Sequence, residues 1–170
     1  MNLKHFLRPG KGASDPTLLF ADQLAFEELI KRLASLFDPN DFDKIICIEG
    51  KGFLLGGAVA NAMKKGVALV RTRGKLKNET YSVNYSDYSK EEKILEIQKN
   101  SVAEGEKVII VDDWVETGNT IKAAVELIGK CGGKIVGIGA FMDDSSEELK
   151  KEFEQYNYRF LEEVTEEDKF

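Results

Sequence analysis

Two adjacent carboxylates, Asp112 and Asp113, end an apolar run of the sequence and come just before a stretch of small polar residues. That stretch, TGNT at 117–120, lies where an amphipathic pattern typical of a helix begins. The start of a helix leaves backbone N–H groups free, and together with two hydroxyls these groups suit an anion such as phosphate. Beside such a turn, the two carboxylates can accept hydrogen bonds from vicinal hydroxyls or hold a hydrated Mg²⁺ ion.

Basic residues follow two other apolar runs. Lys51 comes just after the run at 44–49, and Arg71 and Lys75 lie at and beyond the end of the run at 67–71. In an open parallel sheet, ligands bind beyond the carboxyl ends of the strands, so these cations are expected at the same edge as the two acids. A local cluster of this kind suits a second, more highly charged phosphate group. The predicted ligand is a sugar that carries phosphates at both ends.

The elements that must position these residues alternate along the chain. Strands are expected at 44–49, 67–71, 107–113, 132–142 and 158–163, and helices at 22–37, 50–66, 118–130 and 146–156. Continuous apolar runs separated by helices are typical of a parallel sheet that is covered on both faces. We therefore predict an α/β fold with a doubly wound, mainly parallel twisted sheet flanked by helices.

The segment at 73–98 gives a weaker core signal than the rest. Polar residues and tyrosines dominate it until a weak strand resumes around 94–97. Because long segments of this kind more often serve a binding site than the core, we predict a lid.

Composition limits the possible classes of protein. With 170 residues, 42% of them hydrophobic, the chain is expected to form one domain. A net charge of −6 argues against a nucleic-acid or membrane surface. No apolar run approaches the roughly 18 residues of a membrane span, and the first residues lack the apolar core of a signal peptide, which favours the cytoplasm. Cys47 and Cys131 lie far apart without CxxC spacing, so reduced thiols are expected.

The stretch VIIVDDWVETGNTI at 108–121 resembles the signature of type I phosphoribosyltransferases, which bind 5-phosphoribosyl 1-diphosphate (PRPP) after a strand ending in two acids. Three further stretches are similar to the adenine phosphoribosyltransferase branch: IEGKGFLLGGAVA, LVRTRGKL and ETYSVNYSDYSKEEKILEIQKN. The similarity covers about 18–142. It implies a single phosphoribosyltransferase domain over 1–170, with a flexible lid hairpin at about 73–98 and a small hood at about 1–22. It also implies a homodimer that uses Mg²⁺.

Matching positions carry residue roles over from the family. Asp112 and Asp113 are expected to hold the ribose hydroxyls and, directly or through water, the Mg²⁺ ion. The 5-phosphate is assigned to Glu116, Thr117, Gly118, Asn119 and Thr120. Pyrophosphate is assigned to Glu49, Gly50, Lys51, Gly52, Arg71 and Lys75. The base is assigned to Leu19, Phe20 and Trp114. The family pattern also implies a cis peptide between Glu49 and Gly50.

The implied reaction transfers the ribosyl C1 from pyrophosphate to a base nitrogen through an oxocarbenium-like transition state. It requires cations for the leaving group, fixed acceptors for the ribose and exclusion of water. Asp87 stands where the branch usually carries a Glu near the reacting base, and its alternative role is that of a solvated loop acid. Glu116 is the second candidate catalytic residue.

The identity of the base is left open by two positions. Ala21 replaces an Arg of the adenine hood, of which only Asp22 is retained. Glu116 occupies a position that is small in adenine enzymes but acidic in 6-oxopurine enzymes, where the acid serves the purine N7. Its alternative role is to charge the first turn of the following helix.

The branch resemblance favours adenine, and a 6-oxopurine enzyme is the second possibility. A third is a PRPP-sensing regulator without catalysis, because Lys51 and Thr72 replace an Arg and a Lys that are common in the family. In each case the expected partners are PRPP and a purine base, with neither nucleic acid nor membrane.

Overall fold

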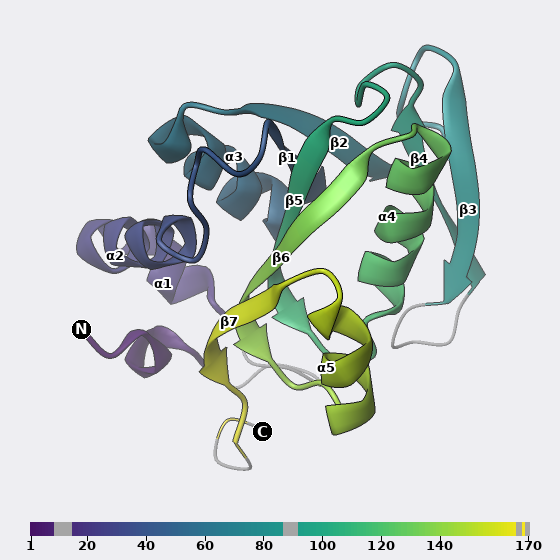
Figure 1. Ribbon diagram of the computed structural model, residues 1–170. Coiled ribbons are helices and arrows are strands. Elements are labelled where there is room, and N and C mark those ends of the chain that lie inside the picture. The colour runs from purple at the N-terminus through teal and green to yellow at the C-terminus, as the bar shows by residue number, and fades with distance from the viewer. Residues whose placement is uncertain (9–14, 87–91, 166–167, 169–170) are drawn as a thin grey trace.

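The computed structural model describes residues 1–8, 15–86, 92–165 and 168. Its centre is one sheet of seven strands in the order β3-β4-β2-β1-β5-β6-β7 (Figure 1). The strands are β1 (Lys44–Ile48), β2 (Gly66–Thr72), β3 (Thr80–Ser86), β4 (Glu92–Gln98), β5 (Lys107–Val115), β6 (Lys134–Asp143) and β7 (Tyr158–Glu163). Strands β2, β1, β5, β6 and β7 run parallel, and β4 and β3 extend the β2 side antiparallel.

Helices cover both faces of this sheet (Figure 1). They are the short 3-10 helix η1 (Leu3–Phe6) and the helices α1 (Thr17–Ala21), α2 (Gln23–Ala34), α3 (Lys51–Met63), α4 (Asn119–Lys130) and α5 (Glu147–Glu154). Two hydrophobic clusters fill the layers, one formed with η1, α1, α2 and α3 and the other with α4 and α5. The predicted doubly wound α/β fold with a mainly parallel sheet is therefore confirmed.

Strand β1 shows why the apolar runs form a sheet with two covered faces. Ile45 and Cys47 belong to the cluster beneath α2 and α3, whereas Ile46 and Ile48 belong to the cluster beneath α4. Successive side chains of a strand point to opposite faces, so a strand that is buried on both faces needs an uninterrupted apolar run.

Element ends differ from the predicted ones where tertiary contacts decide them. The helix expected at 50–66 ends at Met63, because Lys64 adopts a left-handed conformation (φ 56°) as its C-cap. The helix expected at 22–37 is found as α2, which begins at Gln23 because Asp22 is its N-cap and accepts a hydrogen bond from the Ala25 N–H at 2.9 Å, and which ends at Ala34. Strand β5 extends beyond Asp113 because its last residues still pair with β6.

The segment predicted as a lid with one weak strand contains two complete strands. Strands β3 and β4 form an antiparallel pair, and β4 joins the sheet along β2, with Val70 opposite Ile97. Val83 is the one β3 residue that is fully buried among those described, which explains the weak core signal of this strand. Most of the segment is thus part of the sheet. A lid role stays a prediction, and the residues between the two strands lie outside the described ranges.

Among the residues that the structure describes, no helix has both the length and the apolar character needed to cross a lipid bilayer.

Helix α3 lies close against β1. A Cβ atom added at Gly56 would lie 2.5 Å from the sulfur of Cys47, whereas one added at the neighbouring Gly57 would meet nothing within 4 Å. The position of the start of α3, at the carboxyl end of β1, therefore depends on the absence of a side chain at Gly56.

This contact gives a matched pair of substitutions on one helix. Gly56→Ala is expected to destabilise the fold by about 1–3 kcal/mol through overpacking. Gly57→Ala should stabilise it by about 0.5–1 kcal/mol, because alanine restricts the unfolded chain more than glycine does. Urea unfolding followed by circular dichroism measures both values. Equal shifts of the two variants would contradict the close packing.

Candidate functional site

The candidate site lies at the carboxyl edge of the sheet, where the predicted residues after β1, β2 and β5 meet. Helix α3 begins after β1 and helix α4 begins after β5, and the N-cap residue of neither helix makes a side-chain capping hydrogen bond. Their N-caps are Gly50 (φ 108°) and Gly118 (φ 69°). Uncapped helix starts leave backbone N–H groups available to an anion.

The cis peptide expected between Glu49 and Gly50 is wrong. All peptide bonds within the described ranges are trans. Gly50 instead turns the chain with φ 108° and ψ −135°, a conformation that glycine adopts without the clash that a Cβ atom would cause.

Asp112 and Asp113 form the centre of this edge, and each is 9% exposed. The backbone N–H of Asp113 donates a hydrogen bond to Oδ1 of Asp112 at 2.9 Å. Two residues at the start of α3 approach the pair: Lys51 Nζ lies 2.5 Å from Oδ2 of Asp113, and a Cβ at Gly52 would lie 3.1 Å from Oδ1 of Asp112. The structure thus brings together the acids and the lysine that the sequence separates by about sixty residues.

Burial governs the electrostatics of the pair. Burial, and then the charge of Asp113, raise the pKa of Asp112 well above its ordinary value. The charged form of Asp112 is therefore stabilised by whatever brings hydrogen-bond donors or positive charge to this edge.

The loop after β2 is organised around Glu49. Its carboxylate accepts a hydrogen bond from the Thr72 N–H at 2.7 Å, forms an ion pair with Lys75, and lies 3.4 Å from a guanidinium nitrogen of Arg71. Burial acts to raise the pKa of Glu49, but the contacts with Lys75 and Thr72 outweigh it and lower this pKa to about 2. Glu49 therefore stays charged and holds two of the cations predicted for pyrophosphate.

Arg71 is held on its other side by an aromatic ring. Its guanidinium carbon lies 5.7 Å from the centre of the Phe53 ring, and its Nε is buried without a hydrogen-bond partner. A buried donor without a partner is costly, so this nitrogen would gain from an anion at the site.

Glu96 positions the loop after β2, and sequence reasoning missed it. It is 5% exposed, and its Oε1 accepts hydrogen bonds from the backbone N–H groups of Gly74 and Leu76, both at 3.1 Å. These bonds fix the loop that carries Lys75. A single acid inside the apolar run ILEIQ was the available signal.

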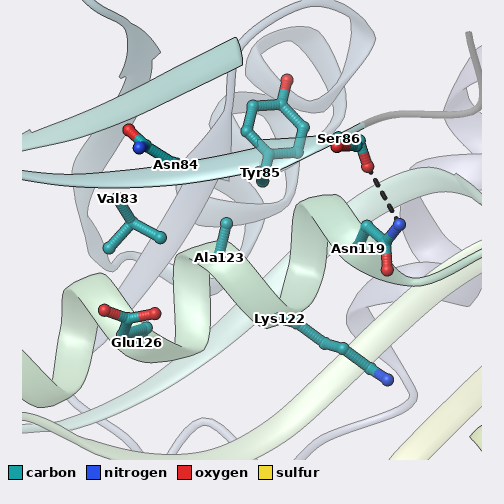
Figure 2. Close-up of a pocket in the computed structure, with 8 residues that line it drawn as sticks. All are labelled: Val83, Asn84, Tyr85, Ser86, Asn119, Lys122, Ala123 and Glu126. Carbon is teal, nitrogen blue, oxygen red and sulfur yellow. Dashed lines mark hydrogen bonds between the residues drawn. The ribbon is translucent and has the colours of Figure 1, made fainter. Parts of the chain in front are cut away.

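The turn after β5 is the candidate phosphate cradle. Glu116 and Thr117 are exposed, Gly118 is buried, and Thr120 lies in the first turn of α4. The backbone N–H of Asn119 donates a long hydrogen bond to Thr117 Oγ1 at 3.4 Å, and its side-chain amide donates to the carbonyl of Ser86 at 2.9 Å (Figure 2). Asn119 therefore ties the end of β3 to the turn.

A pocket of about 290 Å³ lies beside this turn, between β3 and α4 (Figure 2). Of the residues predicted for PRPP, only Asn119 lines it. The pocket is therefore separate from the acids and cations of the edge.

The residues predicted for the base are less clearly grouped. Leu19 is fully buried in the cluster beneath α1, α2 and α3, so its side chain is not available to a ligand. Phe20 packs edge-to-face on Phe26 with ring centroids 6.1 Å apart, and Trp114 packs partly buried against the same cluster. Their contact with a base stays a prediction. Asp87 lies outside the described residues.

The sequence is similar to a known protein family and to individual proteins of that family. The model of the phosphoribosyl transferase domain family matches residues 20–168. The adenine phosphoribosyltransferase of Desulforamulus reducens is 39% identical over 142 residues, which are 83% of this chain and 81% of that protein. The adenine phosphoribosyltransferase of a Thermotoga species is 37% identical over 169 residues, covering 95% of this chain and 98% of the relative.

Solved structures agree with the sequence comparison. The crystal structure of adenine phosphoribosyltransferase from Thermoanaerobacter pseudethanolicus matches with a TM-score of 0.85 and 32% identity, over 95% of this chain and 98% of that one. The Saccharomyces cerevisiae enzyme, crystallised with adenine and an imino-altritol bisphosphate, matches with a TM-score of 0.78 and 29% identity, over 94% and 95%. The chain described here belongs to the phosphoribosyltransferase family, in the branch of the adenine phosphoribosyltransferases.

Proposed function

We propose that this protein transfers the 5-phosphoribosyl group of PRPP to a purine base and releases pyrophosphate, with adenine as the favoured base. The observation that carries the proposal is the meeting of Asp112 and Asp113 with Lys51 between two uncapped helix starts. Membership of the adenine branch supports it.

In this proposal each end of PRPP has its own place at the edge of the sheet. The carboxylates of Asp112 and Asp113 accept hydrogen bonds from the ribose hydroxyls, and the turn at 116–120 receives the 5-phosphate through its backbone N–H groups and the hydroxyls of Thr117 and Thr120. As the bond from C1 to the pyrophosphate oxygen breaks and a base nitrogen bonds to C1, the charge that develops on pyrophosphate is stabilised by Lys51, Arg71 and Lys75.

The cations proposed for pyrophosphate already form ion pairs within the protein, and the ligand must replace them. Lys51 is paired with Asp113, and Lys75 and Arg71 are paired with Glu49. Because the Glu49 carboxylate repels pyrophosphate, Glu49 and Gly50 can contribute only through their backbone. The phosphates of the ligand therefore replace the protein carboxylates as partners of these cations. When Lys51 turns to the ligand, Asp113 becomes free to bind the ribose.

Magnesium fits this site as an ion held by two carboxylates together with water and substrate. No group of three or more His, Cys, Asp or Glu side chains that could hold a metal ion occurs in the described part of the chain. Two neighbouring carboxylates suit Mg²⁺, which commonly keeps several waters and binds one or two carboxylates together with substrate phosphates. We assign it to Asp112 and Asp113, directly or through water; the ion would neutralise charge on the diphosphate leaving group.

Glu116 favours a second candidate, a 6-oxopurine base. Its side chain is exposed at the start of the turn, two residues before the N-cap of α4. As a general acid or base, Glu116 would exchange a proton with the purine N7. In its alternative role, its negative charge would only stabilise the start of α4 through the helix dipole. Asp87 remains the other proposed catalytic acid.

The wider organisation is proposed from the family. The chain is a single domain over 1–170 that acts as a cytoplasmic homodimer without nucleic acid or membrane. The hood at about 1–22 holds the base with the side chain of Phe20 and, because the Leu19 side chain is buried, with the backbone of Leu19; Trp114 of β5 contributes from the same cluster. The segment at about 73–98 closes over the site.

The first prediction from the proposed function concerns the choice of base. With PRPP and Mg²⁺, adenine should support release of pyrophosphate, and hypoxanthine, guanine and xanthine should be slower. A coupled pyrophosphate assay measures the four rates. Release with hypoxanthine or guanine but not adenine would assign the enzyme to 6-oxopurines. PRPP binding without release for any base would leave a sensor and contradict the proposed activity.

The second prediction concerns the ribose acids. Asp113→Asn should lower kcat/KM for PRPP by about ten- to hundredfold, since hydrogen bonds to charged groups contribute about 1.5–3 kcal/mol. Steady-state kinetics with varied PRPP measure this loss, and thermal melting checks the fold. Kinetics that equal those of the unmodified chain would remove Asp113 from the site.

The third prediction separates the two roles of Glu116. If it is an acid or base for a 6-oxopurine, Glu116→Gln lowers kcat with that base by about 10²-fold or more and leaves the KM of PRPP unchanged. Glu126→Gln, which removes an exposed acid of the helix α4 that follows Glu116, is the control. Equal small effects of both substitutions on every base would reduce Glu116 to a surface charge.

A further inference from the structure

A buried acid outside the proposed site raises a separate question. Asp143 ends β6 and is 0% exposed, and it pairs in register with Val115 at the end of β5, two residues beyond Asp113. A buried carboxylate is costly unless it is paired and hydrogen-bonded. None of the proposed chemical steps uses Asp143.

The partners of Asp143 come from three directions. Its Oδ1 accepts hydrogen bonds from the hydroxyls of Tyr158 at 2.5 Å and Ser145 at 2.7 Å. Its Oδ2 lies 3.3 Å from Lys150 Nζ, which is ion-pair range, although no hydrogen bond reaches that oxygen. Lys150 also binds Glu163 at 2.6 Å and Glu147 at 3.0 Å. Asp143 thus joins the end of β6 to α5 through Lys150 and to β7 through Tyr158.

Helix α5 in turn forms the wall behind the phosphate turn. A Cβ atom at Gly118 would lie 2.6 Å from Leu149 Cδ2 and 3.0 Å from Phe153 Cζ. Phe153 also stands edge-to-face against Tyr158, with ring centroids 5.6 Å apart. A continuous path of contacts therefore runs from Asp143 through Tyr158 and Phe153 to Gly118, the N-cap of α4.

We propose that Asp143 is a positioning residue for the phosphate turn: with Lys150 and Tyr158 it fixes α5, and α5 holds Gly118 so that the N–H groups of the turn converge on the 5-phosphate. This inference rests on the proposed function, which assigns the 5-phosphate to that turn. It adds three residues that touch no substrate but set the geometry of a substrate contact.

Binding of two partial ligands tests the inference. Ribose 5-phosphate reports on the phosphate turn and the ribose acids, whereas inorganic pyrophosphate reports on the cations after β1 and β2. Tyr158→Phe removes one hydroxyl and keeps the ring against Phe153, and Lys150→Met removes the cation. Calorimetry should show that ribose 5-phosphate binds about tenfold more weakly to each variant. This is the size expected when the displaced turn loses one hydrogen bond to the charged phosphate. Pyrophosphate binding should be unchanged.

Lys44→Met is the matched control. Lys44 is buried to about the same extent as Lys150 and pairs with Glu106 at 2.8 Å, but it begins β1 and so lies at the amino ends of the parallel strands. It should lower the melting temperature as Lys150→Met does and leave ribose 5-phosphate binding intact.

Two results would overturn the inference. In the first, Tyr158→Phe and Lys150→Met lose stability like the control but bind ribose 5-phosphate as the unmodified chain does, so the cluster only supports the fold. In the second, the unmodified chain fails to bind ribose 5-phosphate, so the phosphate assignment fails and the inference falls with it.

Discussion

The approach of the start of α3 to the end of β5 is the contact on which the rest of the site depends. Lys51 reaches Asp113, and Gly52 leaves room for Asp112, because a Cβ atom added at Gly52 would lie only 3.1 Å from Oδ1 of Asp112. Two uncapped helix starts and two carboxylates then share one edge of the sheet. The close packing of Gly56 against the Cys47 side chain sets the distance between α3 and β1, and this distance places the start of α3 beside the two acids.

Charge is balanced locally in this chain, which is acidic overall with a net charge of −6. The cations proposed for pyrophosphate are each paired with a carboxylate of the protein, Lys51 with Asp113 and Lys75 with Glu49. The two lysines are half-exposed, whereas Asp113 is buried, so exchanging one set of partners for another costs less than leaving that buried carboxylate without a partner.

Local patterns predicted most of the fold, and tertiary contacts decided the remainder. Apolar runs predicted the parallel strands because such strands are buried on both faces. Strand β3 escaped detection because Val83 is its one fully buried residue among those described. The end of α3 was misplaced because Lys64, rather than a glycine, adopts the left-handed cap.

The candidate site divides in the same way. Asp112, Asp113 and Lys51 could be placed together from the rule that parallel strands bind ligands at their carboxyl ends. Asp143 ends an apolar strand just as Asp112 does, but its partners Lys150 and Tyr158 are 7 and 15 residues away along the chain, so no motif marks them. The expected cis peptide failed because Gly50 makes the turn with a trans bond and a positive φ.

A crystal structure with PRPP and Mg²⁺ tests the central claim most directly. The ribose hydroxyls should lie on Asp112 and Asp113, the 5-phosphate on the turn that begins helix α4, and the diphosphate beside Lys51, which should have left Asp113. PRPP bound elsewhere, for example in the pocket between β3 and α4, with the pair of Lys51 and Asp113 intact, would contradict it.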